Sequence, residues 1–321
     1  MRDTAGPTRT TAGPIRTTTG PTPASGGPTP ATTGRLVTWL PWLLLAVLIL
    51  AQIGYPLTDG PARARLTVAT VGLGYLLSVT HALLTRGRRT AAALVVVTTG
   101  GGFAVEAIGL ATGFPFGGYD YSGALGPKLA GVPLVIPLAW TWMAWPAWLA
   151  AVRLTTGRSV PGPARTGSAG TGVAPGARRT VLRVLLAAVG LAAWDVFLDP
   201  QMVSEGYWTW LDSGPTLPGV PGVPISNYLG WLLFAIILMA LLRPAAGPDA
   251  SRVADPADRP MYALYLWTYA SSVLAHAVFL DLPASAGWGA LAMSVVAVPL
   301  AGTLLRDRQR PGTPLRGQQR P

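Results

Sequence analysis

Apolar and polar residues follow one another along the chain in long blocks, and eight apolar blocks are about as long as a membrane-spanning helix. A helix needs about 20 predominantly apolar residues to cross the roughly 30 Å hydrocarbon core of a bilayer. The predicted helices cover residues 36–55, 66–84, 90–112, 129–152, 180–198, 225–242, 261–280 and 286–305. The pattern therefore predicts an all-α, polytopic bundle of about eight transmembrane helices within residues 35–306.

The two ends of the chain have a different pattern. Residues 1–34 repeat Thr, Pro, Gly and Ala with few large apolar side chains, and residues 307–321 are polar and basic. Such segments bury too little apolar surface to offset the entropy of ordering, so we expect both to be disordered tails. No signal-peptide pattern precedes the first apolar block, which we interpret as a transmembrane helix.

Positive charge is distributed unevenly between alternate connections. The two tails and the connections at 85–89, 153–179 and 243–260 hold 20 Lys and Arg residues, whereas the other connections hold 3. Cytoplasmic segments of membrane proteins are enriched in these residues. The split predicts a multi-pass protein of the cell membrane with both termini in the cytoplasm.

Composition agrees with this assignment and narrows the partners. Half of the 321 residues are hydrophobic and 12% are charged, against about 25% charged in soluble proteins. The net charge of +11 lies at helix ends and in the tails, so we expect membrane lipid and no nucleic acid around the protein. The absence of cysteine excludes disulfides and thiolate metal ligands.

One stretch, residues 113–148, combines a glycine-rich aromatic loop with a proline-rich apolar helix. Proline in a helix interior is costly unless neighbouring helices or waters satisfy the freed backbone groups. The loop carries one acid, Asp120, and one lysine, Lys128. We interpret this stretch as the wall and lid of a site for an apolar substrate.

The predicted topology gathers the acids on the outer side. Glu106, Asp195 and His276 each lie within about 5 to 9 Å of the outer boundary at about 1.5 Å per residue. Asp120, Asp199, Glu205 and Asp212 are expected in outer loops, with Glu205 solvated. An acid near a helix end can simply reach water, but an intramembrane ionisable group is a functional hypothesis by default.

Two of these acids have informative neighbours. Glu106 follows Gly100, Gly101 and Gly102, which thin the helix and allow another backbone or a ligand to approach closely. Asp195 and Asp199 are one helical turn apart, but Pro200 biases Asp199 out of helical geometry.

An internal similarity pairs Glu106 with Asp195. Each is followed, 25 and 27 residues later, by a Gly-Val-Pro sequence, at 131–133 and 222–224, where the next helix is expected to start. Two units of the same orientation would be related by an axis along the membrane normal.

Several longer motifs carry a family resemblance that covers about residues 36–305. They are 114–121 (FPFGGYDY), 125–129 (LGPKL), 131–134 (GVPL), 136–140 (IPLAW), 194–202 (WDVFLDPQM), 206–208 (GYW) and 222–227 (GVPISN). Together they resemble the membrane carotenoid hydratases of bacteria and archaea. This resemblance implies addition of water across the terminal double bond of an acyclic carotenoid, with a lycopene-like or C50 substrate and other carotenoid enzymes as possible partners.

Hydration of a trisubstituted alkene needs a proton donor, a stabilised tertiary cation and a base that holds water. A carboxyl group in apolar surroundings keeps its proton, which suits Glu106 or Asp195, and we predict that these two act as a pair, with Asp199 and Asp120 as further catalytic candidates. Aromatic faces stabilise a cation through their quadrupoles. The predicted substrate-binding residues are Phe114, Tyr119, Tyr121, Lys128, Trp140, Trp194, Asn227 and His276. The reaction requires no metal and no other cofactor.

Two other classes of protein remain as alternatives. The spacing Asp195-x-x-x-Asp199 is also found in membrane prenyltransferases, which hold a diphosphate through magnesium and need basic residues as well. A carotenoid-binding protein without catalytic activity would keep the aromatic residues but has no need for several acids. Cyclisation of a carotenoid begins with the same protonation but excludes water from the cation.

Overall fold

The computed structural model describes residues 1, 30–156, 175–211, 214–246 and 255–309. The helices are α1 (Pro30–Gly54), η1 (Tyr55–Leu57), α2 (Gly60–Arg86), α3 (Arg88–Leu94), η2 (Val95–Gly100), α4 (Gly101–Thr112), α5 (Ile136–Thr156), α6 (Pro175–Ser204), α7 (Ile225–Ala246), η4 (Pro256–Asp258), α8 (Arg259–Leu274), η5 (Ala275–Phe279) and α9 (Pro283–Gln309). The strands are β1 (Tyr119–Tyr121), β2 (Lys128–Leu129), β3 (Val132–Pro133) and β4 (Trp208–Trp210). The chain is thus an all-α polytopic bundle with small strand pairs in its connections.

The expected tails lie mostly outside the described residues, as does Asp212. In the part of these segments that the structure describes, α1 begins at Pro30 and α9 continues to Gln309, and the expectation of disordered tails stays a prediction. Proline is favoured in the first turn of a helix. At the other end, Asp307 forms an ion pair with Arg153 of α5, which ties the last turn of α9 to the bundle.

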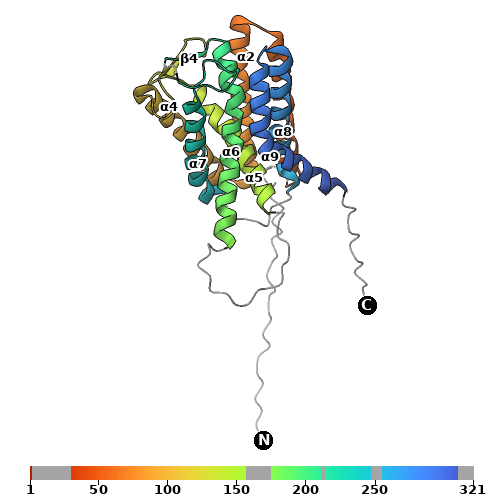
Figure 1. Ribbon diagram of the computed structural model, residues 1–321. Helices are drawn as coiled ribbons and strands as arrows, with labels where there is room; N and C mark the ends of the chain where they lie inside the picture. Colours follow the sequence, from red (N-terminus) through yellow and green to blue (C-terminus); the bar gives the residue numbers. More distant parts are fainter. Residues whose placement is uncertain (2–29, 157–174, 212–213, 247–254, 310–321) are drawn as a thin grey trace.

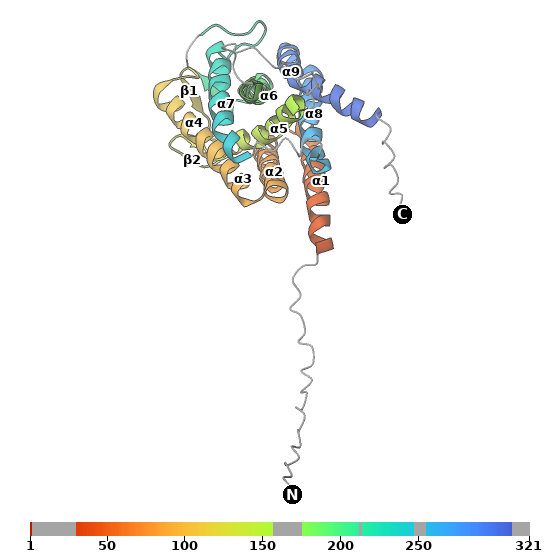
Figure 2. The same cartoon turned by 90° about the horizontal axis from the view of Figure 1, so that it is seen from below.

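Helix α6 lies at the centre of the bundle, and α5, α7 and α9 surround it (Figure 2). Within the described residues, six helical segments are long and apolar enough to cross a membrane: Trp39–Leu57, Gly60–Arg86, Arg88–Thr112, Gly176–Ser204, Ile225–Ala246 and Pro283–Gln309. Helix α5, rich in Trp and Pro, is buried along nearly its whole length, and α8 has 16 residues. Neither α5 nor α8 is among these six segments, so the membrane spans expected at 129–152 and 261–280 stay predictions.

The helix predicted to start at residue 129 starts at Ile136 instead. Residues 128–133 form the β2–β3 hairpin, in which Lys128 is paired with Pro133 and Leu129 with Val132. Gly131 turns the chain with a φ of 82°, a conformation that suits glycine. The Gly-Val-Pro sequence therefore forms the turn and second strand of a hairpin. The helix itself starts three residues later.

The second Gly-Val-Pro sequence has the same local structure. Gly222 has a φ of 84°, and Val223 is fully buried, as Val132 is. Helix α7 begins directly afterwards, at Ile225. The two halves of the internal similarity thus share a turn and a buried anchor ahead of a returning helix.

Pro200 does not end α6, contrary to the sequence expectation, and Asp199 is helical. Proline lacks the N–H that would bond the carbonyl of Val196, four residues earlier. The hydroxyl of Ser285, in the first turn of α9, donates to the Val196 oxygen at 2.9 Å. This hydroxyl supplies the missing donor, so the helix continues to Ser204 and Asp195 and Asp199 face the same way.

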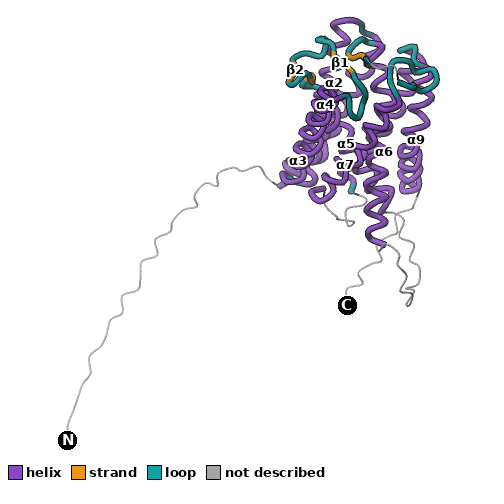
Figure 3. The backbone as a smooth tube through the Cα atoms, turned by 60° about the vertical axis from the view of Figure 1, so that its left-hand side comes forward, coloured by secondary structure: helices purple, strands orange, loops and turns teal. Residues whose placement is uncertain are grey.

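The long connections that the structure describes lie at one end of the bundle, which we call the loop end. Residues 113–135 and 205–211, with their strands, gather there in Figures 1 and 3. In Figure 1 the C-terminal end of α9 lies at the opposite end. The arrangement separates the loops that carry the aromatic motifs from the helix ends that carry most of the arginines.

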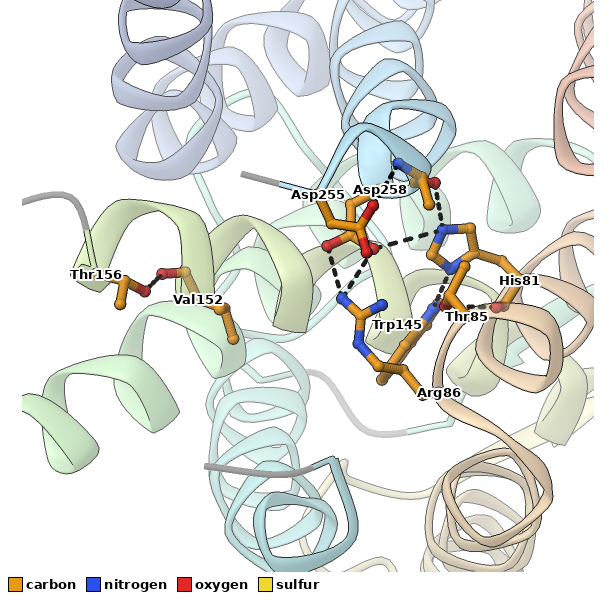
Figure 4. Close-up of polar contacts among 9 residues, drawn as sticks. His81, Thr85, Arg86, Trp145, Val152, Thr156, Asp255 and Asp258 are labelled. Atoms are coloured by element: carbon orange, nitrogen blue, oxygen red, sulfur yellow. Dashed lines mark hydrogen bonds and ion pairs between the residues drawn. The ribbon is translucent and has the colours of Figure 1, made fainter. Parts of the chain in front are cut away.

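A polar cluster at the opposite end joins α2 to α8 (Figure 4). One nitrogen of Arg86 donates to both carboxylate oxygens of Asp258, at 2.9 and 2.7 Å. His81 accepts from the indole N–H of Trp145 at 2.9 Å, so its other nitrogen carries the hydrogen that bonds the Ala257 oxygen at 2.8 Å. Both ring nitrogens of His81 are thus engaged in hydrogen bonds within the protein, so this histidine has a structural role.

We expect reporter fusions to place the loop end outside the cell. The uneven distribution of Lys and Arg predicts that fusions after residue 125 report the outside and fusions after residues 250 and 315 report the cytoplasm. Alkaline phosphatase and fluorescent-protein reporters would give the two readings. A cytoplasmic signal after residue 125 would reverse the orientation.

Candidate functional site

Glu106 lies near the loop end of α4, only 3% exposed, and three side chains donate hydrogen bonds to its carboxylate. The hydroxyl groups of Tyr119 and Tyr121 bond the same oxygen at 2.7 and 2.8 Å. The indole N–H of Trp140 bonds the other oxygen at 3.2 Å. Because an ionised carboxylate is purely an acceptor, this donor set matches a charged group.

The local sequence explains how these donors reach Glu106. Successive residues of a strand point to opposite faces, so Tyr119 and Tyr121 of β1 point inward while Asp120 between them is exposed. A side chain on Gly102 would put its Cβ 2.8 Å from the Trp140 ring. The glycine does allow a close approach, but the approaching group is the Trp140 side chain rather than the backbone or ligand that was expected.

Both tyrosines keep their protons. Burial, together with the charge of Glu106, raises the pKa of Tyr119 and of Tyr121 well above the ordinary value of a phenol. Each hydroxyl is therefore a fixed donor to the Glu106 carboxylate.

A second acidic group lies on α6. Asp195 and Asp199 are 0% and 3% exposed, and the side-chain amide of Asn227 on α7 donates to both. The distance from the Asn227 nitrogen to Asp195 is 3.0 Å. The second oxygen of Asp195 has no hydrogen-bond partner among the described residues. Two buried carboxyl groups that share one amide favour a state with one proton between them.

Glu106 and Asp199 face a common cavity of about 40 Å³, which we call the acid cavity. Its wall is aromatic and apolar apart from a few polar groups. The lining includes Thr67, Val71, Phe116, Tyr119, Tyr121, Leu198, Met202, Trp208, Trp210, Asn227 and Trp231. Asp195 lies behind Asp199 and is not part of this lining.

Other predicted site residues lie elsewhere. Asp120, Phe114 and Lys128 are exposed at the loop end, and the Lys128 ammonium bonds the backbone oxygen of Tyr121. Trp194 packs edge-on against Trp142, with ring centroids 5.0 Å apart, and lines a different cavity.

His276 is buried, and both of its ring nitrogens contact side chains of the protein. The single Ser285 hydroxyl hydrogen goes to Val196, so the Nδ1 of His276 donates to the Ser285 oxygen at 3.0 Å. The other ring nitrogen, Nε2, faces the side-chain amide of Gln201 at 3.3 Å.

Glu205, expected in a solvated loop, is partly buried instead. Its carboxylate forms an ion pair with Arg63 of α2 at 2.5 Å, and its side chain is 17% exposed. The turn after α6 brings Glu205 over α2, so the expectation of a solvated position was wrong.

Sequence reasoning missed three tryptophans of the cavity wall. Trp208 and Trp210 lie on β4, opposite Tyr121 and Tyr119 of β1 in the antiparallel pair. Trp231 of α7 stacks on Trp140, with ring centroids 3.9 Å apart and planes 5° from parallel. The signal available was the alternation Tyr-Asp-Tyr and Trp-Thr-Trp, in which every second residue is aromatic. Two such strands pair so that four aromatic rings share one face.

Among the described residues, no group of three or more His, Cys, Asp or Glu side chains is arranged to hold a metal ion.

Comparison with known proteins adds a family and one curated relative. Residues 66–297 match the model of a family described as "Carotenoid biosynthesis protein". Over 140 residues the chain is 30% identical to the bisanhydrobacterioruberin hydratase of Haloarcula japonica. This match covers 43% of the chain and 40% of the length of that relative. No solved structure matches the chain.

Proposed function

Because the chain belongs to the carotenoid biosynthesis protein family, we propose that it is a hydratase that adds water across the terminal double bond of an acyclic carotenoid. The product would be a tertiary alcohol at the end of the polyene. Support comes from the similarity to a curated hydratase and from the chemistry of the acid cavity.

One observation carries the proposal: two unlike acidic groups face one aromatic cavity. Glu106 has three donors, which suit an ionised base. Asp195 and Asp199 share one amide, which suits a pair that holds a proton. Alkene hydration needs one group of each kind, and environments that differ in this way separate acid from base.

In the proposed reaction Asp199 gives the shared proton to the less substituted carbon of the double bond. The π electrons form the new C–H bond and leave a tertiary cation on the other carbon. A water oxygen then bonds the cationic carbon while Glu106 takes a proton from that water. Return of this proton to the aspartate pair restores the site, so the net change is the addition of one water.

The remaining wall residues fit the intermediate. The aromatic residues Tyr119, Tyr121, Trp208, Trp210 and Trp231 line the space where the cation would form. A cation near an aromatic face gains about 0.5 to 2 kcal/mol, more where water is excluded. A branched alkene end is larger than the cavity, so its entry must widen the site, and Met202 is an adaptable part of the wall.

Expression in a host that accumulates an acyclic carotenoid tests the proposal. We expect chromatography and mass spectrometry to reveal a new product heavier by one water per modified end. A product heavier by a prenyl unit would indicate prenyl transfer, and an isomer of unchanged mass would indicate cyclisation. A carotenoid pool without any change would support a binding protein without this activity.

A further inference from the structure

A second and larger cavity, of about 100 Å³, lies next to the acid cavity. It is lined by residues of α1, η1, α2, α5, α6, α8 and η5. Four residues line both cavities and form the partition between them: Thr67, Val71, Leu198 and Met202. The two spaces are therefore separated by single layers of side chains.

The wall of the larger cavity is unusually polar for the interior of a membrane protein. Seven lining residues carry a hydroxyl or an amide: Gln52, Tyr55, Thr67, Thr70, Gln201, Ser271 and Ser272. The hydroxyl of Thr70 and the indole N–H of Trp142 are buried and have no hydrogen-bond partner within the described part of the chain. A buried polar group that is left unpaired destabilises the fold, so both groups need a partner from outside the protein.

We propose that this cavity is a water site that supplies the nucleophile to the acid cavity. The inference rests on the proposed hydration, which consumes one water per turnover inside an apolar bundle. A polyene has no hydrogen-bonding group and would leave Thr70 and Trp142 unpaired, whereas water pairs with both. A water needs roughly 10 to 15 Å³ of such space, so the cavity holds several.

The partition gives the water a path. Thr67 is the polar residue among the four shared side chains; its hydroxyl donates to the backbone oxygen of Arg63 at 3.0 Å and keeps its acceptor sites for a water. Gln201 of α6 also lines the larger cavity, with its side-chain amide 3.3 Å from the Nε2 of the buried His276. Leu198 and Met202 separate the cation from the water store until a water crosses.

Failure of water supply has a distinct chemical signature. A tertiary cation that meets no water loses a proton and returns to the alkene. In D₂O the acidic groups carry deuterium, and each cation that then loses a protium from this carbon or from a methyl group, rather than the deuteron just added, returns an alkene labelled with deuterium. A variant with a poor water supply will therefore make less alcohol while its recovered substrate gains deuterium.

Thr70→Val tests the inference, because it removes a hydroxyl that bonds no described residue and nearly conserves the volume. We expect alcohol formation in D₂O to fall by about tenfold, the effect of one hydrogen bond. Deuterium in the recovered carotenoid should rise. Ser272→Leu, which fills the same cavity, should act in the same direction, and Thr112→Val, at the exposed end of α4, should match the wild type.

The amounts of alcohol and of deuterium-labelled carotenoid are divided by the amount of membrane-inserted protein. The result for a variant that accumulates poorly can then still be compared with the wild type. Alcohol formation at the wild-type level in Thr70→Val and Ser272→Leu would overturn the inference. A parallel fall of alcohol and of deuterium incorporation would also overturn it, since it would mean that the cavity holds the polyene. If the wild type forms no alcohol, the proposed function itself fails.

Discussion

Replacing Glu106 by glutamine should reduce alcohol formation by about 10² to 10⁴-fold, the range attributed to a general acid or base. The amide has the size of the carboxyl group but cannot take a proton from water. It would also turn an NH₂ group toward one of three donors, from Tyr119, Tyr121 and Trp140. Alcohol per unit of membrane protein, from an acyclic carotenoid, is the quantity to measure.

The matched control is Asp120→Asn on the adjacent strand. Asp120 is exposed, so the same chemical exchange there should leave alcohol formation close to the wild-type value. Normal accumulation of Glu106→Gln in the membrane would show that the loss of alcohol formation comes from the reaction step and not from a loss of folded protein. Near-normal activity of Glu106→Gln would remove this residue from the mechanism.

The second large effect is expected at Asp199. Asp199→Asn removes the acidic proton from the wall of the acid cavity, and we expect a loss of about 10²-fold or more. Asp195→Asn should cost clearly less, because this side chain lies behind Asp199 and an amide there can still hydrogen-bond its neighbour. The comparison uses the same assay and the same host.

The ranking of the two variants is the informative result. A greater loss from Asp195→Asn than from Asp199→Asn would make Asp195 the donor, as the pairing with Glu106 suggested at first. Equal and complete losses would mean that the two aspartates act as one unit whose parts cannot be separated by single changes.

The sequence was informative wherever the signal was local. Glycines ahead of Glu106 predicted a close approach, and Gly102 does receive the Trp140 ring. Long apolar blocks predicted a polytopic helical bundle, and six segments of the part of the chain that the structure describes have the length and composition to span a membrane. Both features depend on a few adjacent residues, so a single sequence is enough to recognise them.

The errors arose where a distant contact decides the local structure. Pro200 predicted a break before Asp199, but Ser285, 85 residues later, satisfies the carbonyl that the proline leaves free. Trp208 and Trp210 join the site only because β4 pairs with β1 across about 90 residues. Asp195 and Asp199 lie one turn apart on the same face of α6, so their positions in the sequence do not distinguish them. Packing alone decides which of the two side chains reaches the cavity.

The central claim is that the acid cavity protonates a carotenoid double bond and captures the cation with water. Purified wild-type protein and Glu106→Gln, incubated with an acyclic carotenoid in D₂O, test it most directly. The account predicts that the wild type gives a tertiary alcohol with one non-exchangeable deuterium beside the carbinol carbon, and that the variant gives almost none. Alcohol without that deuterium, or equal amounts from both proteins, would contradict it.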